Sequence, residues 1–79
     1  MVLDINIKSA EDAEKLSAVA CKTPDVLWAH SIDGMIMVDC RSLLGLFTLI
    51  GKPCHLVAED TTSPKTLTKV ARRAGVAIN

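Results

Sequence analysis

The stretch that decides the fold is Arg41-Ser42-Leu43-Leu44-Gly45-Leu46-Phe47-Thr48-Leu49-Ile50-Gly51. It begins near Ser42, a residue type that caps helices, and it ends at Gly51, a residue type that stops them. The residues between these two are mostly apolar, and they present more apolar surface than a helix this short needs to pack on one face. Because β-prone segments lie on both sides, the stretch predicts a short helix inserted between strands.

An Asp33-Gly34 turn lies upstream and predicts a β-hairpin. Asp-Gly is typical of two-residue type I′ turns, which would place Ile32 opposite Met35. In that register one face of the hairpin is suited to the core. Its pairs are Ser31–Ile36, Ala29–Val38 and Leu27–Cys40. The opposite face then carries Trp28, His30, Ile32, Met35, Met37 and Asp39.

The other elements are predicted from periodicity and capping. Alternating apolar residues at 3–7 predict a first strand, and the segment 54–59 predicts a last one. Ser9 and Ser63 are suited to cap two amphipathic helices, and Gly75 is suited to end the second. The predicted order is therefore β-α-β-β-α-β-α.

This order predicts an α+β fold in a single domain spanning residues 1–79. We expect an open-faced β-sandwich, with a four-stranded antiparallel sheet and three helices on one face. Hydrophobic residues make up 49% of the chain, which is enough for one modest core.

Charge and composition exclude several classes of function. Nine basic and nine acidic residues cancel, so no net field recruits nucleic acid or an anionic membrane. One Trp and one Phe are too few for a base-stacking platform. No apolar run reaches the ~20 residues of a membrane span, and the amino-terminal residues lack the pattern of a signal peptide, so we expect a cytoplasmic protein. Three widely spaced cysteines predict reduced thiols, with no metal site and no cofactor.

The Ser-capped short helix after a hairpin resembles HPr, the phosphocarrier protein of the bacterial sugar phosphotransferase system. Arg41-Ser42-Leu43-Leu44-Gly45 is similar to the Lys-Ser-Ile-Met-Gly segment at that family's regulatory serine. Asp33-Gly34 matches the turn between the family's second and third strands. The resemblance spans nearly the whole chain, and it implies that the helix after Ser42 contributes to a surface for docking partners.

The catalytic segment of the family is not matched. HPr proteins carry a Gly-Ile-His-x-Arg-Pro type motif, in which a histidine takes phosphate at a helix amino terminus beside an arginine. The histidine position falls near Ser9 here, and the arginine position near Glu11. Glu11 and Asp12 would repel a phosphoryl group. The remaining histidines, His30 and His55, lie within predicted strands, so we expect no phosphocarrier chemistry and no enzyme activity.

Two surfaces are candidates for protein contacts. Ser42 is foremost a helix cap, and the resemblance implies that it is also a candidate for regulatory phosphorylation, with Arg41 beside the phosphoryl group. The predicted partner-binding residues are Arg41, Leu43, Leu44, Leu46 and Phe47. Deep burial of this helix under neighbouring loops is the alternative. Exposed apolar side chains on the open sheet face predict a homodimer contact. These are Trp28, Ile32, Met35 and Met37.

The leading hypothesis is a non-catalytic HPr-like domain that regulates through protein contacts, with phosphotransferase-system or carbon-regulation components as partners. Two alternatives stay open. One is a phosphocarrier with an unusual acceptor. The other is a small-molecule-binding module of the ferredoxin-like ACT type, which shares the β-α-β-β-α-β order but has a longer second helix. Lys69, Arg72 and Arg73 lie on the polar face of the last helix and predict no function by themselves.

Overall fold

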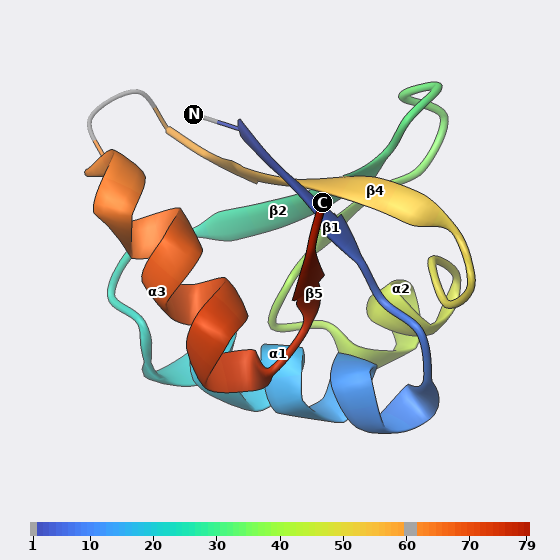
Figure 1. Ribbon diagram of the computed structural model, residues 1–79, viewed down its shortest axis with the longest axis horizontal. Helices are drawn as coiled ribbons and strands as arrows, with labels where there is room; N and C mark the ends of the chain where they lie inside the picture. The colour runs from blue at the N-terminus through green and yellow to red at the C-terminus, as the bar shows by residue number, and fades with distance from the viewer. Residues whose placement is uncertain (1, 60–61) are drawn as a thin grey trace.

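The computed structural model describes residues 2–59 and 62–79. It has an α+β architecture, in which a five-stranded antiparallel sheet lies on one side and three helices cover one of its faces (Figure 1). The strands are β1 (Val2–Asn6), β2 (Leu27–Ser31), β3 (Met37–Asp39), β4 (Pro53–Ala58) and β5 (Ala77–Ile78). The helices are α1 (Ala10–Lys22), α2 (Leu43–Phe47) and α3 (Pro64–Ala74).

The strand order in the sheet is β3-β2-β4-β1-β5. β4 is therefore inserted between β1 and β2, and it pairs antiparallel with both. Leu56 lies opposite Leu3 on one side and opposite Ala29 on the other. Because side chains alternate across a strand, this row of residues shares the face that the helices cover.

The core lies between this face and the helices. Its buried apolar residues are Ile5, Ile7, Ala13, Leu16, Ala20, Leu27, Ala29, Cys40, Leu46, Leu49, Cys54, Leu56, Ala58, Leu67, Val70, Ala71, Ala74 and Val76. The predicted inward-facing residues Ile5, Ile7, Leu27 and Ala29 belong to this core, which confirms the predicted buried faces of the first two strands, whereas Val38 of β3 is only partly buried against it. Among the described residues, no helix is long and apolar enough to cross a bilayer.

The predicted starts of the three helices are confirmed, but α2 ends at Phe47 and not at Gly51, because residues 48–51 form turns. Ser9, Ser42 and Ser63 occupy the N-cap positions of the three helices, and the Ser9 and Ser42 side chains accept backbone hydrogen bonds there. Gly75 ends α3 with φ of 71°, a left-handed conformation that glycine adopts without strain.

The predicted number of strands is wrong, because the sheet has five and not four. β5 follows the Gly75 cap and pairs with the outer edge of β1, where Ile78 lies opposite Ile5. The short apolar segment after Gly75 was the signal for this strand.

The predicted two-residue hairpin turn is also wrong, although the predicted pairing of Ala29 with Val38 is confirmed. β2 ends at Ser31 and β3 begins only at Met37, so Ile32 and Met35 do not pair. A type I′ turn needs positive φ at both central residues, and only Gly34 has it. Instead, the Asp33 carboxylate accepts hydrogen bonds from the Ser31 hydroxyl (2.6 Å) and the Met35 N–H (3.0 Å), which close a wider loop and lower the pKa of Asp33.

Candidate functional site

Helix α2 is held at both ends by hydrogen bonds. The Ser42 Oγ accepts a bond from the Gly45 N–H at 3.3 Å, as expected of an N-cap. At the other end the Thr48 hydroxyl donates to the Gly45 carbonyl at 2.6 Å. The Gly51 N–H then donates to the Ile7 carbonyl at 2.8 Å, which ties the loop after α2 to the end of β1. A helix of one and a half turns is thus fixed in place without depending on its own propensity.

Gly45 allows α2 to approach β3 closely. A Cβ atom at this position would lie 2.9 Å from the Val38 Cβ and 3.0 Å from its Cγ1. The Val38 Cβ is bonded directly to the backbone of β3, so no side-chain rotation moves it out of the way. The glycine in the Ser-Leu-Leu-Gly segment is therefore required by packing and not by a special backbone conformation.

The apolar residues of α2 divide between the core and the surface. Leu46 is completely buried, so its prediction as a partner-binding residue is wrong. Leu43 is half-buried against the core. Leu44 is 78% exposed and Phe47 is 36% exposed, which confirms that the helix is too apolar for all of its residues to face the core. Since these two lie three residues apart, they are neighbours on the helix surface.

The Arg41 side chain is already engaged. Its Nη2 lies 2.7 Å from the Asp39 Oδ2, its Nε lies 3.1 Å from Oδ1, and its backbone N–H also donates to Oδ1. These hydrogen bonds hold the pKa of Asp39 below its ordinary value. The Arg41 carbonyl accepts a bond from the Ser17 hydroxyl of α1. Arg41 therefore stabilises the corner between β3 and α2.

At the start of α1, the Asp12 side chain accepts a hydrogen bond from the backbone of the same segment. The Asp12 N–H donates to the Ser9 Oγ at 3.2 Å, and the Lys8 N–H donates to the Asp12 Oδ2 at 3.0 Å. Asp12 thus accepts from the backbone at the position where the resemblance puts a phosphate. Glu11, the other predicted carboxylate, instead forms an ion pair with Lys15 at 2.9 Å.

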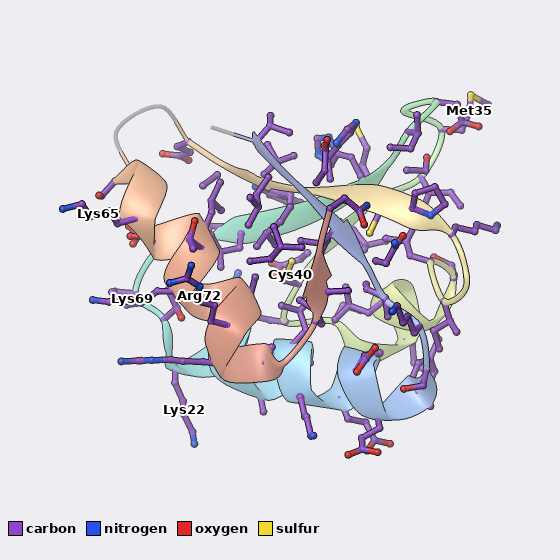
Figure 2. The ribbon with its side chains drawn as sticks, viewed as in Figure 1. Lys22, Met35, Cys40, Lys65, Lys69 and Arg72 are labelled. Carbon is purple, nitrogen blue, oxygen red and sulfur yellow. The ribbon has the colours of Figure 1, made fainter. Side chains whose placement is uncertain are left out.

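The open face of the sheet combines apolar and polar residues. His55 Nδ1 lies 2.6 Å from the Asp4 Oδ1, and His55 also lies opposite His30 across the ladder. Trp28, His30 and Met37 line a shallow hollow of about 340 Å³ on this face. Ile32 and Met35 are exposed, but they lie in the hairpin loop beyond the strand ends, and Figure 2 shows Met35 at the far tip. The predicted dimer residues therefore do not all lie on one flat face.

The three cysteines are free thiols. Cys21 is exposed, whereas Cys40 and Cys54 are buried, and burial raises the pKa of the Cys40 thiol to about 12. A thiol of such high pKa is a poor nucleophile. Within residues 2–59 and 62–79, no group of three or more His, Cys, Asp or Glu side chains is placed to hold a metal ion.

No protein-family model, curated protein or solved structure matches this chain. Its most distinctive features are the exposed apolar pair on α2, the Asp12 carboxylate at the start of α1 and the cations on α3.

Proposed function

We propose that this chain is an HPr-like protein-interaction domain without phosphocarrier chemistry, and that it binds phosphotransferase-system or carbon-regulation components through α2. One observation carries the proposal: Leu44 and Phe47 are exposed neighbours on a helix whose ends and packing are fixed. An apolar pair on a rigid element loses little conformational entropy on binding, which favours its use as a docking site.

The strand order supports an HPr-like sandwich over the ferredoxin-like ACT alternative, which pairs its strands differently. Here β4 lies between β1 and β2. The helix between β3 and β4 is also short, since α2 has five residues, whereas an ACT-type second helix is longer and more amphipathic.

The absence of phosphocarrier chemistry is supported by Asp12. Its carboxylate accepts the hydrogen bond of the Lys8 N–H, so this donor is not free to bind a phosphoryl group. Its negative charge would also repel a phosphoryl group at the same helix start. Incubation with phosphoenolpyruvate and the general kinase of the phosphotransferase system should leave His30 and His55 unlabelled. Stoichiometric acid-labile phosphohistidine would support the phosphocarrier alternative.

Ser42 has a sufficient role as the cap of α2, and Arg41 is held by Asp39. We therefore propose that Ser42 serves as a helix cap and is not a regulatory phosphorylation site. Mass spectrometry of protein purified from cells grown on rich and poor carbon sources would test this, because a quantitatively phosphorylated Ser42 in either condition would contradict it.

The docking proposal is tested by titrating the isotope-labelled chain with the purified general kinase and the purified regulatory serine kinase of the system. We expect amide chemical-shift changes centred on α2 with at least one of them. Leu44→Glu should abolish the changes, because it places a charge in the apolar contact at an exposed position. Met35→Glu is the matched control, since it adds the same charge at an exposed site on the hairpin tip and should bind as the wild type does. Equal effects of the two variants, or no shift with either protein, would refute the proposal.

A homodimer is the second candidate, and the exposure of Trp28 (39%) and Met37 (63%) favours it. Such a dimer would bury the shallow hollow of the open sheet face. Sedimentation at micromolar concentration should then show a species of twice the monomer mass that Met37→Glu dissociates, and a pure monomer would exclude this candidate.

A further inference from the structure

The polar face of α3 carries a stripe of cations. Lys65, Lys69 and Arg73 follow one another at four-residue spacing, and Arg72 lies beside them, so the charges recur at each turn on one side of the helix. Lys22, at the end of α1, lines the same hollow as Lys69 and Arg73. Figure 2 shows Lys22, Lys65 and Lys69 pointing outward on the same side of the molecule. We call these five residues the α3 cationic face.

This face concentrates charge in a chain whose net charge is zero. It contains five of the nine basic residues, and α3 itself contains no acidic residue. Within the described part of the chain, the ion pairs formed by lysine and arginine lie elsewhere, at Lys15 and Arg41. Asp25 lines the hollow beside Lys22, but no ion pair joins the two. The five cations are thus available to an external anion.

Stability of the helix does not explain the stripe. Arg72 and Arg73 lie in the last turn, where the helix dipole favours cations, but Lys65 lies in the first turn, where the dipole opposes them. Like charges four residues apart also destabilise a helix, and Lys65–Lys69 and Lys69–Arg73 are two such pairs. A local pattern that works against its own helix is expected where the residues serve another purpose.

The surface between these cations is hollowed. One hollow of about 480 Å³ is lined by Lys65, Thr68, Lys69, Arg72 and Arg73. A second hollow of about 240 Å³ adjoins it, because the two share Lys69 and Arg73. The aliphatic stems of lysine and arginine give such a surface an apolar floor beneath charged ends.

We propose that the α3 cationic face binds an acidic segment of a partner protein, a helix with carboxylates on one side, independently of the α2 surface. The spacing of the cations along α3 favours a helical partner. Residues 65–73 rise about 12 Å along the axis, and glutamates at the same helical spacing on a partner would meet the cations in register. Small apolar side chains between those glutamates fit the hollows.

Nucleic acid and an anionic membrane fit this face less well. About 12 Å covers roughly four phosphates of one strand, and α3 offers no aromatic side chain for stacking. The apolar residues of α3, among them Leu67 and Val70, are buried in the core, so the helix has no apolar face to insert into a bilayer.

The test uses a fluorescein-labelled helical peptide of alanine and glutamate, with glutamates at alternating four- and three-residue spacing. Fluorescence anisotropy at low ionic strength should show binding to the wild-type chain. A peptide of the same composition with scattered glutamates should bind at least about threefold more weakly. Lys69→Glu combined with Arg73→Glu should weaken binding at least about tenfold, because each exchange replaces an attraction by a repulsion. The milder pair Lys69→Gln and Arg73→Gln should weaken it about threefold or more, and circular dichroism checks that each variant is folded.

Two controls separate the outcomes. Lys8→Glu combined with Lys52→Glu makes the same change in net charge away from α3 and should alter Kd less than twofold. Leu44→Glu should also leave peptide binding unchanged, so failure of the α2 proposal and failure of this one are distinguishable. The inference is overturned if the regular peptide does not bind, if the control pair weakens binding equally, or if the scattered peptide binds as well. Tighter binding of a DNA duplex or of phosphatidylserine vesicles, each measured in parallel, would also overturn it.

Discussion

Replacing Gly45 with alanine sets two opposing effects against each other in α2. Alanine is a better helix former than glycine by about 1 kcal/mol, so helix propensity alone predicts a more stable protein. The added Cβ, however, would lie 2.9 Å from the Val38 Cβ and 3.0 Å from its Cγ1. Overpacking of this kind costs about 1–3 kcal/mol, because the backbone of α2 or β3 must shift. We expect the packing cost to exceed the gain in helix propensity, so that the free energy of unfolding falls by up to about 2 kcal/mol.

In a domain of this size, a loss of that size lowers Tm by up to roughly 15 °C. Thermal and urea unfolding followed by far-ultraviolet circular dichroism would measure it. Leu44→Ala is the control for general effects on α2, since its side chain is exposed and its removal should change Tm little. Adding Val38→Ala to the Gly45 variant removes the Cγ1 contact and should recover part of the loss. A Gly45→Ala protein as stable as the wild type, or more stable, would refute this account of the α2–β3 contact.

Three further predictions concern titration and capping. In the folded state Cys40 keeps a proton that the unfolded chain releases. The free energy of unfolding should therefore fall as pH rises from about 9 toward 12, by at most about 1.4 kcal/mol per pH unit. Cys40→Ala should remove that part of the slope in urea titrations at stepped pH. Hydrogen bonds from Arg41 lower the pKa of Asp39, so their stabilising effect is present above the ordinary aspartate pKa and is lost as pH falls through the lowered value. Arg41→Ala should raise the midpoint of the Asp39 titration measured by NMR. An unchanged midpoint would contradict the pairing of Arg41 with Asp39. Ser9→Ala should lower the free energy of unfolding in urea by about 1 kcal/mol. Ser63→Ala should lower it by less, because the Ser63 side chain makes no cap hydrogen bond. Equal losses for the two variants would contradict this difference.

The residues that specify local structure made the helices predictable from sequence. Ser9 and Ser42 each accept the backbone bond that their position predicted, and Gly75 takes the left-handed conformation that ends a helix. The hairpin turn was predicted wrongly because a side chain there forms hydrogen bonds that stabilise a different backbone conformation. Asp33 was expected to enter a tight turn, but its carboxylate accepts bonds from Ser31 and Met35 and supports a wider loop.

The division of α2 between core and surface was only half predictable. Periodicity indicated that some apolar residues must be exposed, but a helix of five residues is too short to show which ones. The outcome depends on Gly45, because its close approach to Val38 sets the rotation that buries Leu46 and exposes Leu44. The α3 cationic face was visible as basic residues in the sequence, but Lys22 joins it only through the packing of α1 against α3.

The central place of β4 has a consequence for how the chain acquires its structure during synthesis. β1 and β2 have no ladder with one another, and each is joined to the sheet through β4. Until residues 53–58 leave the ribosome, β1 therefore has no strand to pair with, and β2 can pair only with β3. Pairings that span such long separations in sequence slow folding, because the loop must close before the contacts are gained. The sheet is thus expected to assemble in one late, cooperative step, and a nascent chain stalled before β4 should remain sensitive to protease throughout β1.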